Sequence, residues 1–212
     1  MRFRFSPFAV ADMLAAPLFA AAPAAAQVKP DAPAAPEWTK PRGDSQRPEH
    51  GERTYSLDTL FEALKVAPDE ASAKAIEDRI WAIWMSSDSD TCSLLMNRVK
   101  DATDDKDYDL AIKLLDAIIT IKPDYVEAWN RRATLHFVKH EYGRALADIR
   151  EVLAREPRHF GALAGLGLIL QDIGDDKHAL EAYQAALAID PHLHNLTDTV
   201  KTLREKVEGR DI

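Results

Sequence analysis

The chain has 212 residues, 46% of them hydrophobic and 29% charged, so it is long enough and apolar enough to bury a core. A net charge of −8 and a pI near 5.4 argue against a protein that binds duplex nucleic acid, because phosphate binding needs clustered positive charge. The single cysteine, Cys92, excludes an intramolecular disulfide and a cysteine-based structural zinc site.

The first 26 residues have the pattern of an export signal. A short basic start, MRFR, precedes an apolar, alanine-rich stretch, and Ala24 to Ala26 offer a cleavage pattern of small residues before Gln27. We therefore expect a signal peptide over residues 1–26 and a mature protein that is periplasmic or secreted, with no stable membrane span. Asp12 interrupts the apolar stretch, which leaves an uncleaved anchor or an organelle transit peptide as alternatives.

Residues 27–55 carry five prolines among charged and small residues and have no apolar periodicity, so a disordered linker is expected there. A two-helix leading unit is expected over residues 56–86. Ser56 is a suitable N-cap for its first helix, and Pro68 with Asp69 and Glu70 is expected to open its second. The first helix presents Leu57, Leu60, Phe61 and Leu64 at helical spacing, and the second presents Ala73, Ile76, Ile80, Trp81 and Trp84.

Three later stretches end on the same pattern, 34 residues apart. They close at Pro123, Pro157 and Pro191, and each contains an alanine twelve positions before its proline. Each alanine begins about three turns of amphipathic helix that the proline stops, and an upstream helix is expected over residues 93–103, 126–139 and 161–173. Gly143 and Gly174 are expected to supply unusual backbone angles in the turns. A helix hairpin of this size cannot bury its apolar face alone, so the pattern predicts a stack.

The period and the residues at fixed positions resemble the tetratricopeptide repeat (TPR) family. Residues 126–159 and 160–193 carry the pattern most fully, for example through Trp129 and Gly167, whereas residues 91–125 form a degenerate first repeat with Arg98 and Val99 at positions where the family prefers other residues. The implied fold is all-α: a TPR-like helix-hairpin solenoid with the preceding two-helix unit. Residues 194–212 predict a capping helix and tail, with Leu196, Val200, Leu203 and Val207 on one face.

Three stretches resemble metal-binding or phosphate-binding motifs, but none has the residues or the register that such a site requires. The acidic run from Asp101 has Lys106 where a calcium loop needs glycine. His136 and His140 lie four apart but lack the glutamate and the third ligand of a zinc site, so helix packing and a turn position are expected for them. The stretch GALAGLG resembles a phosphate-binding loop, but the 34-residue register places its glycines within a helix. There Gly167 is expected at the small packing position, and Gly161 and Gly165 would allow a neighbouring helix or a ligand backbone to come close. We therefore expect no catalysis, no metal and no cofactor.

In similar proteins the first helix of each repeat contributes to a concave surface that binds partners. The resemblance therefore implies a non-catalytic scaffold or adaptor that binds an extended peptide or partner protein in the bacterial cell envelope. The surface lacks the Lys and Arg cluster of members that bind a terminal carboxylate. Carried over by register, its candidate residues are Met96, Lys100, Glu127, Asn130, Thr134, Phe137, Val138, Ala164, Leu168, Gln171 and Asp172.

Two other functions fit the same sequence. One is a self-associating structural component, in which Trp81 and Trp84 or the end of the array form the interface of a homo-oligomer. The other is an accessory subunit of an envelope enzyme or assembly complex.

Overall fold

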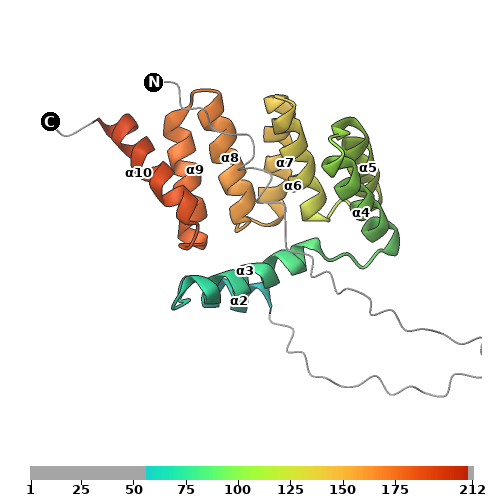
Figure 1. The fold of residues 1–212 in the computed structure, drawn as a ribbon, viewed down its shortest axis with the longest axis horizontal. Coiled ribbons are helices and arrows are strands. Elements are labelled where there is room, and N and C mark those ends of the chain that lie inside the picture. Colours follow the sequence, from blue (N-terminus) through green and yellow to red (C-terminus); the bar gives the residue numbers. More distant parts are fainter. Residues whose placement is uncertain (1–55, 210–212) are drawn as a thin grey trace, which may run out of the picture. The chain divides into compact units, whose positions relative to one another are not determined.

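The computed structural model describes residues 56–209, and in this part of the chain every regular element is an α-helix (Figure 1). The predicted all-α helix-hairpin solenoid is therefore confirmed. The expected signal peptide and linker lie outside the described residues. The helices are α2 (Leu57–Lys65), α3 (Glu70–Met85), α4 (Asp90–Asp104), α5 (Tyr108–Ile121), α6 (Val126–Val138), α7 (Tyr142–Arg155), α8 (Phe160–Asp172), α9 (Asp176–Ile189) and α10 (His194–Glu208).

Short polar side chains fix where the early helices begin. The Ser56 hydroxyl accepts a hydrogen bond from the Thr59 amide at 3.3 Å, as the sequence predicted for the N-cap of α2. Of the three residues expected to open α3, Asp69 is the N-cap, with its carboxylate accepting from the Ser72 amide at 2.7 Å, and Glu70 is the first helical residue, whereas Pro68 precedes the helix. Ser89 caps α4 in the same way, so that helix starts three residues earlier than predicted.

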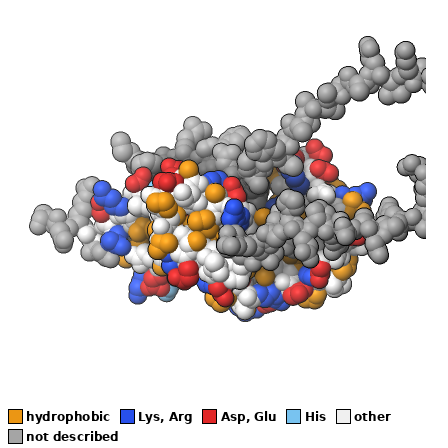
Figure 2. Space-filling model, turned by 90° about the horizontal axis from the view of Figure 1, so that it is seen from below, with side chains coloured by type: hydrophobic (Ala, Val, Ile, Leu, Met, Phe, Trp, Pro, Cys, Tyr) orange, Lys and Arg blue, Asp and Glu red, His pale blue; other side chains and the backbone are white. Residues whose placement is uncertain are grey.

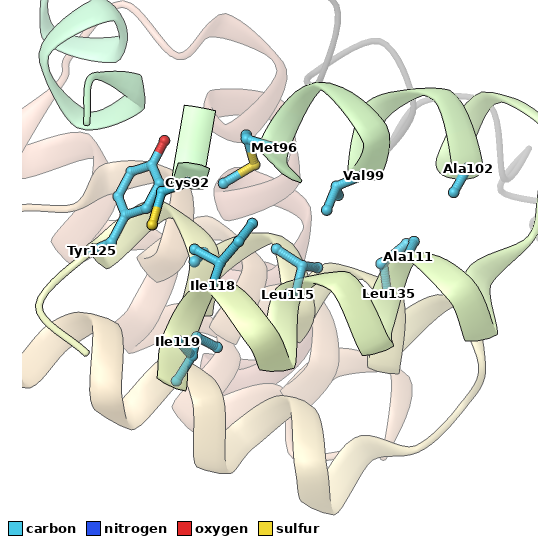
Figure 3. Close-up of a cluster of buried hydrophobic side chains, with 11 residues drawn as sticks. Cys92, Met96, Val99, Ala102, Ala111, Leu115, Ile118, Ile119, Tyr125 and Leu135 are labelled. Atoms are coloured by element: carbon cyan, nitrogen blue, oxygen red, sulfur yellow. The ribbon is translucent and has the colours of Figure 1, made fainter. Parts of the chain in front are cut away.

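Helices α4 to α9 form three antiparallel hairpins, and each hairpin packs on the next. The core crosses the boundaries between repeats, since Ala128 and Leu135 of α6 belong to the cluster built by α4 and α5 (Figure 3). Ile169 of α8 likewise joins Ala145 and Ile149 of α7. Burial of apolar surface between successive hairpins therefore stabilises the stack.

Two small features of this core were anticipated. Gly167 is required by close packing within the third hairpin, because a β-carbon added there would lie 2.5 Å from the Tyr183 ring. The capping helix α10 buries three apolar residues of its predicted face against α8 and α9, whereas Val207 near its end is 37% exposed. The buried three are Leu196, Val200 and Leu203.

The turns between paired helices share a left-handed residue at the same position of every repeat. Lys106 has φ 61°, His140 has φ 58° and Gly174 has φ 90°. The prediction for Gly174 is confirmed. The prediction for Gly143 was wrong: this residue lies inside α7, and His140 takes the left-handed conformation instead.

The leading unit does not extend the stack. Helices α2 and α3 lie across one end of the repeat helices, at the bottom of Figure 1. Apolar side chains of α2 and α3, among them Phe61, Ile80 and Trp84, form one cluster with Phe160 at the start of α8 and with Ile189 and Leu193 near the end of α9. The leading unit is thus fixed to residues that lie about 100 positions further along the chain.

Candidate protein-binding surface

The eleven candidate residues lie on α4, α6 and α8, the first helices of the three hairpins. The structure leaves some of them accessible and buries others. Lys100, Val138 and Asp172 are exposed, and Thr134, Phe137, Leu168 and Gln171 are half-buried. Four are buried: Met96, Glu127, Asn130 and Ala164.

The expectation of an open surface is therefore corrected at these four positions, for two physical reasons. Met96 points into the core of the first hairpin (Figure 3), and Ala164 packs in the cluster formed with α9 and α10. Glu127 and Asn130 lie in the first turns of α6, where α3 approaches. Sequence register alone placed all four on one surface because it does not include packing between elements.

Helix α3 covers the part of the surface formed by the first turns of α6 and α8. The Trp81 indole packs directly against Gly161, where an added β-carbon would lie 2.8 Å from the ring. This confirms that Gly161 admits a close neighbour. The Trp84 ring stacks on the His159 ring with centroids 4.0 Å apart and planes 8° from parallel. We refer to α3 over these turns as the cover.

Polar contacts at its end also hold the cover. The Tyr125 hydroxyl donates to the Met85 carbonyl at 2.7 Å, and Arg131 approaches the Met85 sulfur at 3.1 Å. Figure 2 views the molecule from this side, and hydrophobic side chains gather near the middle of the visible described surface. Val66 and Ile83 are large hydrophobic residues that remain exposed in the leading unit.

Glu127 is the centre of a buried polar network beneath the cover. One carboxylate oxygen accepts from the Arg131 Nε at 3.1 Å, and the other accepts from the Asn130 side-chain amide at 3.0 Å. The His159 Nδ1 accepts the Ala162 amide at 3.1 Å, so its Nε2 carries the proton and lies 3.5 Å from the Glu127 carboxylate. The Asn130 amide thus serves an internal contact in this arrangement.

The remaining part of the surface, on the later turns of α4, α6 and α8, is accessible. We call it the open part and define it by Lys100, Thr134, Val138, Leu168 and Asp172. Val138 is 38% exposed, and Lys100 pairs with Asp104 at 2.6 Å. Asp172 accepts a hydrogen bond from the Tyr142 hydroxyl, whose ring also packs on Phe137. Apolar side chains between polar groups can receive a protein segment through both kinds of contact.

Gln171, His136 and His140 have roles within the fold. The Gln171 side-chain carbonyl accepts from the Tyr183 hydroxyl at 3.1 Å. His136 is buried with its Nδ1 2.7 Å from the Glu141 carboxylate, which confirms the prediction of helix packing. His140 occupies the turn, also as predicted. Within residues 56–209 no group of three or more His, Cys, Asp or Glu side chains is arranged to hold a metal ion, and no helix is long and apolar enough to cross a membrane.

Sequence reasoning missed the cover and the network beneath it. The available signal was the combination of two large residues, Trp81 and Trp84, with Gly161, a position without a side chain on the candidate surface. Nothing in the periodicity joins the two sites, since 80 residues separate Trp81 from Gly161 and α3 lies outside the 34-residue register.

The repeat pattern is also found by comparison with known proteins. Residues 160–193 match the family described as tetratricopeptide repeat. A TPR repeat-containing protein of Rhizobium etli is 42% identical over 153 residues, which cover 72% of this chain and 75% of that protein. This chain belongs to the tetratricopeptide repeat family.

Two further proteins extend the comparison. The small glutamine-rich tetratricopeptide repeat-containing protein 2 of Saccharomyces cerevisiae is 31% identical over 107 residues, 49% of this chain and 30% of that protein. Among solved structures, the first TPR domain of Spaghetti bound to an HSP90 peptide has a TM-score of 0.54 and 17% identity, and covers 57% of this chain and 97% of that chain. At this identity the likeness concerns the TPR fold.

Proposed function

We propose that this TPR protein is a non-catalytic adaptor that binds a partner protein or an extended peptide through the open part of its concave surface. The observation that carries the proposal is the exposure of Val138 on α6, with half-buried Leu168 on the next first helix. TPR domains generally mediate protein–protein interaction, and the similar Spaghetti domain binds an HSP90 peptide.

The binding mode follows from the rigidity of the stack. Because the first helices are held by cores shared between hairpins, their outward side chains keep fixed spacing before a partner arrives. A preformed surface lowers the entropy cost of association. Lys100 and Asp172 have opposite charges on different hairpins, so they can orient a bound segment.

The site of action in this proposal is the bacterial cell envelope. Its support is the amino-terminal pattern of a basic start, an apolar stretch and small residues before Gln27. Cell fractionation of the full chain tests it, with the expected result that the protein is shortened and found in the periplasm or medium. Recovery of the uncut chain in the cytoplasm would overturn this part of the proposal.

Site-specific crosslinking in living cells tests the binding surface. A photoreactive residue is placed at Thr134 or Leu168 in the open part, and at Lys113 or Ala147 on the second helices as matched controls. We expect the same protein adduct from the first two positions and none from the controls. Equal labelling from both faces would contradict the proposed surface.

A further inference from the structure

Three buried polar atoms without a hydrogen-bond partner in the described part of the chain lie where the leading unit meets the repeats. They are the Trp84 Nε1, the His159 Nε2 and the Asp190 Oδ2. The Trp84 Nε1 has no acceptor when α3 is docked, whereas the His159 Nε2 lies 3.5 Å from the Glu127 carboxylate. Docking of α3 is therefore less favourable than its apolar cluster alone would make it.

Asp190 is the group whose missing partner is easiest to identify. Its side chain is fully buried in the connection between α9 and α10, and its Oδ1 accepts from the His192 amide at 3.0 Å. Glu77, half-buried on α3, lies within hydrogen-bonding reach of this carboxyl group. Two adjacent carboxyl groups in such a place do not both ionise readily, and one shared proton makes a hydrogen bond between them.

The charged groups around the pair determine where the proton is held. Lys74 and Asp78 lie nearby on α3, and His192 and His194 face Asp190 from the connection and the start of α10. The histidines, when protonated, favour ionised Asp190, so the proton belongs on Glu77. Burial, and then the charge of Asp190, raise the pKa of Glu77 to about 7, and burial raises the pKa of Asp190.

We propose that α3 is a reversible cover on the binding surface, latched by a proton that Glu77 donates to Asp190, and that loss of this proton favours exposure of Glu127, Asn130 and Gly161. The exposure of a second part of the binding surface rests on the function proposed above; the latch itself does not. In the open state the Trp81 and Trp84 sites also become available to the partner.

The direction of the pH effect follows from where Glu77 is protonated. With α3 docked, Glu77 keeps its proton up to about pH 7, whereas a solvated glutamate loses it near 4.5. The docked state therefore binds more protons, and docking weakens as pH rises from about 4.5 to 7 and changes little above that range. The shift corresponds to at most about 300-fold in the docking equilibrium, and solvent screening at half-buried Glu77 reduces this.

Hydrogen exchange on the full chain at pH 5 and pH 8, corrected for intrinsic exchange rates, tests the latch. We expect protection of the α3 amides to fall by between about 10-fold and 70-fold at pH 8 relative to the α5 amides, because a solvated glutamate is already mostly ionised at pH 5. In Glu77→Gln the side-chain amide can donate to Asp190 at both pH values, so protection of α3 should no longer depend on pH. Glu62→Gln, a change to an exposed acid of α2 that does not face the pair, should behave as wild type.

A wild-type α3 with equal protection at both pH values, or a Glu77→Gln variant that keeps the wild-type pH dependence, would overturn the latch. Crosslinking separates this failure from failure of the proposed function. Adducts at Thr134 without a pH effect on exchange would retain the binding surface and reject the latch. The predicted exchange without an adduct at Thr134 or at Asn130 would retain the latch and reject the binding surface.

Discussion

A single residue in each turn shows how one backbone requirement is met by different side chains. Lys106, His140 and Gly174 stand 34 residues apart and all have positive φ. Glycine reaches this region without the steric cost that a β-carbon brings. Only the third turn uses glycine, although the sequence offers another one three residues after His140.

Replacement of the two glycines should have opposite effects. Gly174→Ala should lower the free energy of unfolding by about 1 kcal/mol, because alanine is strained at φ 90°. Gly143→Ala should raise it by up to about 0.5 kcal/mol, because Gly143 lies in α7 and a β-carbon there meets no atom within 4 Å. Urea denaturation measures both, and destabilisation by Gly143→Ala would contradict the assigned turn geometry.

At the same scale, the sequence predicted residues whose role depends on spacing and failed for residues whose role depends on a distant partner. The small position at Gly167 and the N-cap at Ser56 follow from register and local hydrogen bonding. The burial of Glu127 could not be predicted, because its network needs Arg131, Asn130 and His159 together under α3.

Among the helices, Arg132 joins two hairpins through charge. Its guanidinium donates to both oxygens of Asp148 on α7, at 2.9 and 2.7 Å, and to Asp116 on α5 at 2.6 Å. Asp148 is 5% exposed, so its charge depends on this partner, whereas the Asp116 side chain is 53% exposed and contributes less.

Arg132→Met should therefore lower the free energy of unfolding by about 3 kcal/mol, because Asp148 is left as an uncompensated buried charge. Arg150→Met, on the exposed face of α7, is the matched control and should change it by less than about 0.5 kcal/mol. Adding Asp148→Leu to the first variant should restore part of the loss. Equal effects of Arg132→Met and Arg150→Met would contradict the bridging role.

The helices themselves were largely predictable, since apolar spacing and capping residues act within one element. The start of α4 differs from the predicted one because Ser89 caps the helix before its apolar spacing begins. The docking of α2 and α3 was not predictable, because the apolar face of α3 could pack in several ways. The observed packing depends on His159 and Gly161 at the start of α8, far along the chain. Sequence reasoning therefore identified the unit but not its place.

Taken as a whole, the described part of the molecule combines a repeated scaffold with one element that does not repeat. The 34-residue period accounts for the hairpins, their shared cores and the capping helix α10. The leading unit departs from the period and covers part of the surface that the period creates. Features outside the repeat therefore determine how much of the proposed binding surface is accessible.

Affinity for the partner captured by crosslinking tests the central claim, that the open part of the concave surface binds a protein, most directly. Val138→Glu and Leu168→Glu place a charge on this surface, and each should weaken binding at least tenfold in a titration with the purified partner, since a desolvated charge without a partner costs about 1.4 kcal/mol or more. Ala147→Glu, exposed on the second helix α7, should leave the dissociation constant unchanged. Unchanged affinity in the first two variants, or an equal loss in all three, would contradict the claim.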